Sequence, residues 1–370
     1  MRESRTTAAM NEEPADPTRA GAARRLQGLA ASLAVVVLSS AAYCAMPYNR
    51  GQCQARHAVG GLVFTGTGFL TSAALGYMAM LVLYHLAAPA RGMSKSLGAF
   101  EAVAALFRPT RQRRAAFTPE RQLALRATLL KAFFAPLMAM SLMVFFVSAW
   151  RNGAAILASD ALDQGARALF DRHGFWFALQ LIVFVDVLVF TVGYLIELPR
   201  LKNEIRSVDP TLLGWAAALL CYAPFNQVTA MILGSQTEEF PKFDDPALHL
   251  VLNAVMLGSM AVYASASIAL GWKASNLTHR GIVIRGPYAW IRHPAYTCKN
   301  IAWWIGSIPL VSAAFSVSLW GGLQSLASVA GWTLLYVLRA LTEEDHLRSV
   351  DGDYAAYAAQ TRYRFIPGVI

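Results

Sequence analysis

Two clusters of polar residues stand out near the end of this otherwise apolar chain. The first is the segment 278–296, which contains Arg292-His293-Pro294 and Tyr296. A proline suits the first turn of a helix, because the N–H that it lacks would have no helical partner there. Arg292 and His293 would then stand at a helix N-terminus, a position that attracts anions. Taken alone, the segment also fits a basic, aromatic anchor at a membrane surface.

The second cluster is the segment 339–346, which contains Arg339, Glu343, Glu344 and His346. Arg339 and Glu343 are four residues apart and would share one face of a continuous helix. Glu344 would point roughly 100° away from Glu343. We therefore expect Glu343 to face a pocket and Glu344 to face water, so that losing Glu344 has the milder effect. A solvated helix end with an ion pair is the plainer alternative.

A third group of residues follows in the last segment of the chain. Tyr354 and Tyr357 are three apart, so they can pack on one face of a helix. The chain then continues as Arg362-Tyr363-Arg364-Phe365-Ile366-Pro367. By itself this segment fits an interfacial helix with aromatic anchors.

Long apolar runs must position these clusters. Hydrophobic residues make up 56% of the 370 residues and charged residues 15%, whereas soluble domains usually have about 25% charged residues. Runs of about 20 apolar residues match the thickness of a bilayer. We expect an all-α polytopic membrane protein with about eight transmembrane helices, a C-terminal helical hairpin turning near Gly321-Gly322, and a cytosolic helical tail. The expected spans are 26–46, 60–87, 128–150, 175–196, 212–233 (kinked at Pro224), 248–272, 301–317 and 321–338.

The net charge of +10 is explained by basic loops that alternate with the spans, which favours the positive-inside rule over nucleic-acid binding. Basic residues gather in the tail and in loops 88–127, 197–211 and 273–300, whereas loop 234–247 is acidic. The pattern predicts cytosolic termini and no nucleic-acid partner. The expected division is a disordered cytosolic tail at 1–25, membrane helices without a motif at 26–247, and a catalytic region at 248–370.

The four cysteines form no CxxC pair, so the sequence supports no metal or redox motif. Cys44 and Cys53 flank a short loop that we expect outside the cell. The sequence is compatible both with a disulfide between these two cysteines and with two free thiols.

The three clusters together resemble the isoprenylcysteine carboxyl methyltransferase family, which is grouped with the phospholipid methyltransferases. The resemblance rests on Arg-His-Pro-x-Tyr opening a helical hairpin, Arg-x-x-x-Glu-Glu after it, Gly-x-Tyr-x-x-Tyr, and a terminal Arg-x-Ile-Pro. It covers roughly residues 270–370. Each motif is weak, but their order and spacing form a specific set.

This resemblance implies an S-adenosylmethionine-dependent methyltransferase at the cytosolic face. Its acceptor would be lipophilic or lipidated, and a carboxylate such as that of isoprenylcysteine is one such acceptor. Arg339 matches the family's substrate-binding arginine and Glu343 its cofactor-binding glutamate, and these two are the expected catalytic residues. By resemblance the cofactor site is formed by Arg280, Gly281, Ile282, Val283, Tyr288, His293, Pro294, Ala295, Tyr296 and Glu343.

Two departures bear on the substrate rather than on the fold. Cys298 stands where many members have glycine, and Arg280 stands where prenylcysteine enzymes commonly have histidine. The main alternative is an NADPH-dependent membrane reductase of the sterol-reductase type, but Glu343-Glu344 suits a polyanionic dinucleotide poorly. A transporter is the non-enzyme alternative, for which Asp186 and Pro224-Phe225-Asn226 are the only intramembrane signals.

Overall fold

The computed structural model describes residues 17–87, 94–158, 165–234 and 237–369, and it confirms an all-α membrane architecture. Seven helices in the described part of the chain are long and apolar enough to cross a bilayer. They are Gly21–Ala45, Gly66–Ala87, Pro119–Ala158, Ala166–Leu195, Pro246–Lys273, Pro294–Val317 and Leu319–Val350.

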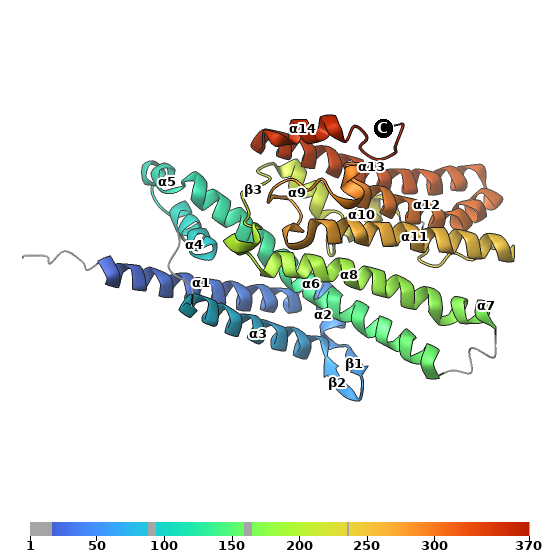
Figure 1. Cartoon of the computed structure of the whole chain (residues 1–370), viewed down its shortest axis with the longest axis horizontal. Helices are drawn as coiled ribbons and strands as arrows, with labels where there is room; N and C mark the ends of the chain where they lie inside the picture. The colour runs from blue at the N-terminus through green and yellow to red at the C-terminus, as the bar shows by residue number, and fades with distance from the viewer. Residues whose placement is uncertain (1–16, 88–93, 159–164, 235–236, 370) are drawn as a thin grey trace, which may run out of the picture. The chain divides into compact units, whose positions relative to one another are not determined.

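Figure 1 labels the elements in chain order. The helices are α1 (Pro17–Ala45), α2 (Pro47–Gln54), α3 (Gly66–Ala87), α4 (Lys95–Leu106), α5 (Thr110–Ala116), α6 (Pro119–Ala158), α7 (Ala166–Leu169), α8 (Phe175–Leu195), α9 (Leu212–Leu219), α10 (Asn226–Leu233), α11 (Pro246–Leu270), α12 (Pro294–Val317), α13 (Leu319–Val350) and α14 (Asp353–Gln360). The strands are β1 (Arg56–Val59), β2 (Leu62–Thr65), β3 (Ser207–Val208) and β4 (Thr278–His279), and they pair antiparallel as β1–β2 and β3–β4.

The chain forms two compact units. The smaller unit contains the described residues up to Leu38 and those of Leu75–Thr128, and the larger contains Ser39–Ala74 and the described residues from Leu129 onward. Inside the smaller unit, Arg121 at the start of α6 donates from Nε and Nη2 to Glu101 Oε2 on α4, at 3.0 and 2.8 Å. Inside the larger unit, helices from both sides of the expected boundary at 247/248 pack together, as α8 does with α11.

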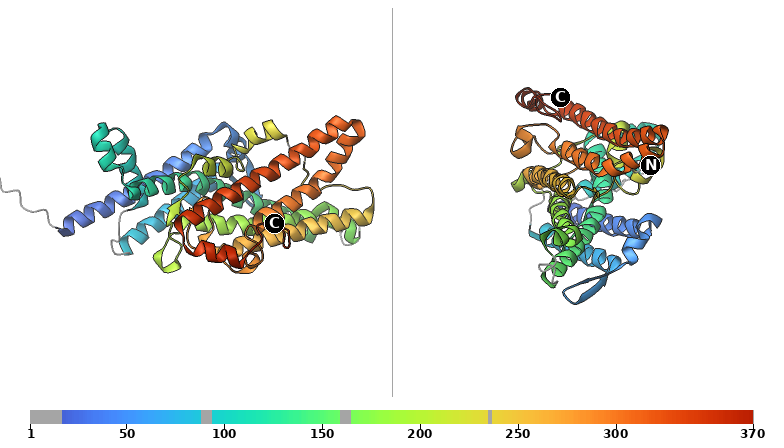
Figure 2. Two further views of the ribbon diagram at one scale, coloured as in Figure 1. Left: turned by 90° about the horizontal axis from the view of Figure 1, so that it is seen from above. Right: turned by 90° about the vertical axis from the view of Figure 1, so that its right-hand side faces the viewer.

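Four long helices position the polar clusters in the larger unit. Helices α8, α11, α12 and α13 lie side by side in that order (Figure 1), and α12 and α13 form the predicted hairpin (Figure 2). Phe175 of α8, Met256 of α11 and Ile305 of α12 are buried together between these helices. The apolar faces of the helices therefore meet each other in the core and leave their polar ends free to form a site.

Local sequence explains where these helices begin. Asp245 accepts a hydrogen bond from Leu248 N–H at 2.6 Å and Pro246 follows it, so α11 starts with a capped first turn. Ser318 caps α13 in the same way through Gly321 N–H, at 2.9 Å. The hairpin therefore turns at Ser318, and the predicted turn at Gly321-Gly322 is wrong by a few residues. A Cβ at Gly322 would lie 2.1 Å from the Phe315 ring, so this glycine allows the two helices to approach.

The expected fifth span, 212–233, is two short helices rather than one kinked helix. Helix α9 ends at Leu219 and α10 begins at Asn226, with turns between them around Pro224. Proline cannot donate a helical hydrogen bond, so the break leaves carbonyl groups that need other partners. Thr229 Oγ1 donates to one of them, Leu220 O, at 2.9 Å.

The segment containing α9 and α10 nevertheless runs from one end of the larger unit to the other. Near its start, Glu197 pairs with Lys131 at 2.6 Å, at the end where α8 finishes. Near the finish of the segment, the centre of the Phe240 ring lies 4.5 Å from the centre of the Phe175 ring, at the end where α8 starts. The segment therefore makes one end-to-end pass of the larger unit without being a continuous helix, and it is not among the seven membrane-length helices of the described residues.

Three further expectations about the first part of the chain can be compared with the structure. The expected second span starts late, because residues 56–65 form the β1–β2 hairpin and α3 begins only at Gly66. Cys44 and Cys53 are free thiols whose sulfur atoms lie 3.2 Å apart. Of the tail 1–25, residues 1–16 lie outside the described residues, and α1 begins at Pro17.

The path of segment 196–245 predicts membrane topology. Reporter fusions at Arg200 and at Phe243 should give opposite signals, because the segment between these positions passes once from one end of the larger unit to the other. Fusion reporters active on only one side of the membrane measure this directly. Equal signals at both positions would mean that the segment returns to the side from which it starts.

Candidate active site

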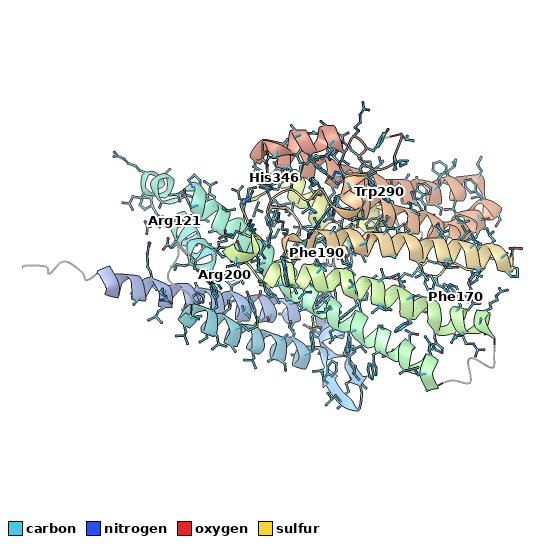
Figure 3. All side chains as sticks on the ribbon, viewed as in Figure 1. Arg121, Phe170, Phe190, Arg200, Trp290 and His346 are labelled. Atoms are coloured by element: carbon cyan, nitrogen blue, oxygen red, sulfur yellow. The ribbon has the colours of Figure 1, made fainter. Side chains whose placement is uncertain are left out.

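A pocket lies between the polar end of the hairpin and the helices beside it. It is lined from α8 (Phe190), from the segment around α9 (Asp209, Gly214, Ala218, Tyr222) and from α11 (Tyr263, Ser267, Leu270). The remaining lining residues are Ser275, Asn276, Leu277, Thr278, Tyr288, Arg292, His293, Ala295, Tyr296, Lys299, Tyr336, Arg339, Thr342, Glu343, His346 and Leu347. Figure 3 labels two of them, Phe190 on α8 and His346 on α13.

Arg339 projects into this pocket from α13 and is buried among aromatic rings. Its guanidinium carbon lies 5.0 Å from the centre of the Tyr296 ring, 5.4 Å from that of Tyr222 and 5.9 Å from that of Tyr336. Only 7% of the residue is exposed. Within the described residues, no carboxylate lies at ion-pair distance from Arg339. A buried cation stacked on rings but not paired with an acid is a ready receptor for an anion.

Asn276 holds Arg339 in place. Its backbone N–H and its Nδ2 both donate to the Tyr194 hydroxyl, at 2.8 Å each, which fixes the orientation of the amide. The Asn276 Oδ1 atom then accepts a hydrogen bond from Arg339 Nη2. The adjacent Leu277 has a φ of 61°, a left-handed conformation that is uncommon for a non-glycine residue and that clusters at functional sites.

Glu343 lies one turn further along the same face of α13. The Tyr296 hydroxyl donates to its Oε2 at 2.7 Å, and the carboxylate faces the pocket. Burial, with a further contribution from Glu343, raises the pKa of Tyr288, so this phenol keeps its proton. The prediction that Arg339 and Glu343 share a face is confirmed, whereas the alternative of an ion pair between them is not observed among the described residues. Glu343 and Arg339 thus place an anionic and a cationic group in the pocket that do not neutralise each other.

Glu344 does not face water, and this prediction is wrong. Its side chain is fully buried: Oε1 lies 2.7 Å from Arg292 Nε and 3.2 Å from His293 Nε2, and Oε2 lies 2.7 Å from Arg348 Nη2 and 3.2 Å from Arg364 Nε. Helix periodicity located the face correctly, but the start of α12 and the last residues of the chain cover that face.

The C-terminal segment is fastened across the start of α12. Backbone N–H groups of Arg292 and His293 donate to the carbonyls of Tyr363 and Arg364, both at 2.9 Å. The Tyr357 hydroxyl donates to Tyr288 O at 3.0 Å. Tyr354 and Tyr357 are both buried with ring centres 5.8 Å apart, so their predicted packing on one helix face is confirmed.

The residues expected from the resemblance do not all line this pocket. Those that do are Tyr288, His293, Ala295, Tyr296, Arg339 and Glu343, whereas Arg280, Gly281, Ile282, Val283 and Pro294 do not. Arg280 turns inward, and its Nη1 donates to Gly193 O at 2.9 Å and to Asn203 O at 3.1 Å. Pro294 is the first residue of α12, as its chemistry predicts. Residues 275–278, which come just before the expected stretch 280–283, line the pocket in its place.

The β3–β4 pair, whose strand β4 follows residues 275–277, connects this part of the chain to the end of α13. His279 Nε2 lies 2.6 Å from Asp351 Oδ2. Burial lowers the pKa of His279, although Asp351 pulls it in the opposite direction. Ser207 Oγ lies 3.1 Å from His346 Nε2, which joins β3 to α13.

Residues 247–349 match the model of the isoprenylcysteine carboxyl methyltransferase (ICMT) family. The match confirms the resemblance for a little over a quarter of the chain, including the hairpin, Arg339 and Glu343. Comparisons with curated proteins and with solved structures found no match. The pocket is lined in large part by this methyltransferase-family segment.

Five lining residues lie outside the matched segment and were missed by sequence reasoning: Phe190, Asp209, Gly214, Ala218 and Tyr222. Asp209 is 2% exposed, and its Oδ1 accepts from Thr211 N–H at 2.8 Å. A Cβ at Gly214 would lie 2.0 Å from Asp209 Oδ2, so only glycine leaves room for this carboxylate. An Asp-x-Thr before a helix is a common capping pattern, so the sequence offered no sign of a pocket there.

Glu344→Gln should destabilise the protein strongly, by about 3 kcal/mol or more, because removing one partner of a buried ion pair leaves its cations uncompensated. The thermal midpoint in detergent measures this. Asp345→Asn is the matched control, since that side chain is 76% exposed and its contact with Arg348 is a surface pair. Equal midpoints for the two variants would contradict a structural role for Glu344.

Proposed function

We propose that this chain transfers a methyl group from S-adenosylmethionine to an anionic, lipophilic acceptor, at the cytosolic face of a membrane. The observation that carries the proposal is the pair Arg339 and Glu343. They line one pocket four residues apart on α13, yet within the described residues each faces the pocket without pairing with the other. Such a pocket suits two ligands of opposite charge at adjacent positions.

The donor set fits S-adenosylmethionine. The ammonium group of the cofactor can donate to the Glu343 carboxylate. The cofactor's own carboxylate suits the N-terminus of helix α12, because a helix N-terminus attracts anions. His293 stacks on Tyr296 at 5.4 Å between ring centres and gives that end of the pocket a rigid aromatic wall. Asp209, from outside the matched segment, adds a second carboxylate to the lining. These residues are the ones we assign to holding the cofactor.

The acceptor is assigned to Arg339. A carboxylate held there would be aligned by the guanidinium and shielded from water by Tyr222, Tyr296 and Tyr336, and such positioning is the main requirement of an in-line displacement. When bound, S-adenosylmethionine supplies a methyl group that is already activated: the acceptor oxygen forms the O–CH3 bond, and the electrons of the S–CH3 bond stay on sulfur. No proton has to move, so the pocket needs no general base for a carboxylate acceptor.

The location of the pocket supports entry of a lipophilic acceptor from the bilayer. The pocket lies at the end of the bundle where the basic connections 197–211 and 273–300 gather, which is the cytosolic end by the positive-inside rule. Apolar side chains remain exposed on the membrane-length helices beside it, such as Ile301 and Leu334. Cofactor from the cytosol and acceptor from the membrane can therefore reach the same site.

Glu343→Gln should weaken binding of S-adenosylhomocysteine by roughly 10- to 150-fold, because a charge-assisted hydrogen bond is worth about 1.5–3 kcal/mol. Calorimetry in detergent measures the affinity, and Asp345→Asn serves as the control on the same helix. Unchanged affinity in Glu343→Gln would remove the cofactor assignment of Glu343. Binding of NADPH without any response to S-adenosylhomocysteine would favour the reductase alternative.

Arg339→Met should abolish transfer of labelled methyl from S-adenosylmethionine into a membrane lipid extract. Its affinity for S-adenosylhomocysteine should stay within a few-fold of that of the parent protein, since Arg339 is assigned to the acceptor. Methionine keeps the apolar stem among the tyrosines, and Arg362→Ala, on the exposed tail, is the matched control. Retained turnover in Arg339→Met would contradict the acceptor assignment.

A further inference from the structure

A carboxylate that the proposed reaction does not use is buried beside the same pocket. Asp186 lies in the middle of α8, within an apolar membrane-length helix and outside the matched segment. Only 4% of the residue is exposed. An acidic side chain at such a position is costly, and in membrane proteins it usually marks a functional site.

Two hydroxyl groups of α11 satisfy this carboxylate. The Tyr263 hydroxyl donates to Asp186 Oδ2 at 2.8 Å, and the Ser267 hydroxyl donates to Oδ1. Each carboxylate oxygen therefore has one hydroxyl donor, and each hydroxyl has committed its single proton. A hydroxyl oxygen also has two acceptor lone pairs, and these remain available after its proton is used.

Both Tyr263 and Ser267 line the pocket, together with Lys299 from α12. Because the hydroxyl protons of Tyr263 and Ser267 point to Asp186, these two residues can offer a ligand in the pocket hydrogen-bond acceptors but no hydroxyl donor. The α8–α11 side of the pocket is thus chemically distinct from Arg339, which offers only donors. It also differs from Glu343, because its acceptors are neutral.

We propose that Tyr263 and Ser267, oriented by Asp186, form a subsite for an N–H or O–H group of the methyl acceptor. The proposal rests on the proposed function and makes the acceptor more specific. The acceptor would be an amphiphile with a carboxylate for Arg339, an apolar chain, and an amide N–H or a hydroxyl near the carboxylate. Asp186 acts through the two hydroxyls and is a positioning residue.

A purely structural role for Asp186 is the competing explanation. Hydrogen bonds from Tyr263 and Ser267 to Asp186 also tie α11 to α8, and such interhelical bonds stabilise membrane helices. That role predicts a loss of stability on substitution, with no change in the choice between ligands. Ligand selectivity therefore separates the two explanations.

Two probes that differ in one group provide the test. N-Dodecanoylglycine has a carboxylate and an amide N–H, and N-dodecanoylsarcosine has N–CH3 in place of that N–H. Their affinities are measured by calorimetry in detergent with S-adenosylhomocysteine present. The parent protein should bind the N–H probe up to about tenfold more tightly, the value of one hydrogen bond.

The variants are designed around the direction of the protons. Asp186→Asn keeps the shape, but its amide donates to one hydroxyl, which must then turn its own proton toward the pocket. The ratio of the affinities for the N–H probe and the N–CH3 probe should fall toward one. The double variant Tyr263→Phe with Ser267→Ala should show the same fall. Ser265→Ala is the matched control, because Ser265 lies on the same helix, is outside the pocket lining, and donates to Val262 O at 2.7 Å.

Several results would overturn the subsite. Equal affinities of the two probes in the parent protein would overturn it and leave the proposed function intact. An unchanged preference for the N–H probe in Asp186→Asn, together with a lower thermal midpoint, would have the same meaning. Binding of S-adenosylhomocysteine without binding of either probe would also overturn it. Loss of S-adenosylhomocysteine binding in the parent protein would instead count against the proposed function.

Discussion

The architecture of the site depends on the buried carboxylate of Glu344. It brings together basic side chains from three parts of the chain: the start of α12 (Arg292 and His293), the end of α13 (Arg348) and the C-terminal segment (Arg364). A buried carboxylate is tolerated only with such partners. Because these contacts join the two ends of the hairpin to the tail, they also set the distance between the pocket walls on which Tyr296 and Arg339 stand.

Adjacent glutamates on one helix consequently have different surroundings. Glu344 is enclosed by cations and has a structural role, which leaves Glu343 facing the pocket with a phenol as its partner. Arg339, one turn away, is held by an amide and three aromatic rings. Glu344 pairs with Arg292, Arg348 and Arg364, whereas Arg339 and Glu343 have no ion-pair partner among the described residues.

The pocket is shared between the methyltransferase-family segment and the part of the chain before it. The family segment contributes Arg339, Glu343 and the start of α12, whereas the preceding part contributes Asp209, Tyr222 and, next to the pocket, Asp186. The proposed roles do not divide along this boundary. Tyr263 and Ser267 of the proposed acceptor subsite lie in α11, inside the matched segment, whereas Asp186, which orients them, lies before it.

Local properties of the chain were readable from the sequence alone. Apolar runs identified the membrane-length helices, Pro294 marked the start of α12, and a spacing of four residues placed Arg339 and Glu343 on one face. These properties depend on hydrophobicity, proline geometry and helix period, which act within about one helical turn. The order and spacing of the motifs were also sufficient to indicate the family.

Tertiary structure decided which faces are covered and which groups meet. Periodicity gave the direction of Glu344 but could not reveal that Arg364 and the α12 start cover it. The break between α9 and α10 is stabilised by Thr229, and the inward turn of Arg280 by Gly193 O and Asn203 O. Asp186 was visible as an acid in an apolar helix, but its hydroxyl partners on α11 lie far away in sequence. Each outcome depends on contacts between distant segments, and the packing of the helices determines those contacts.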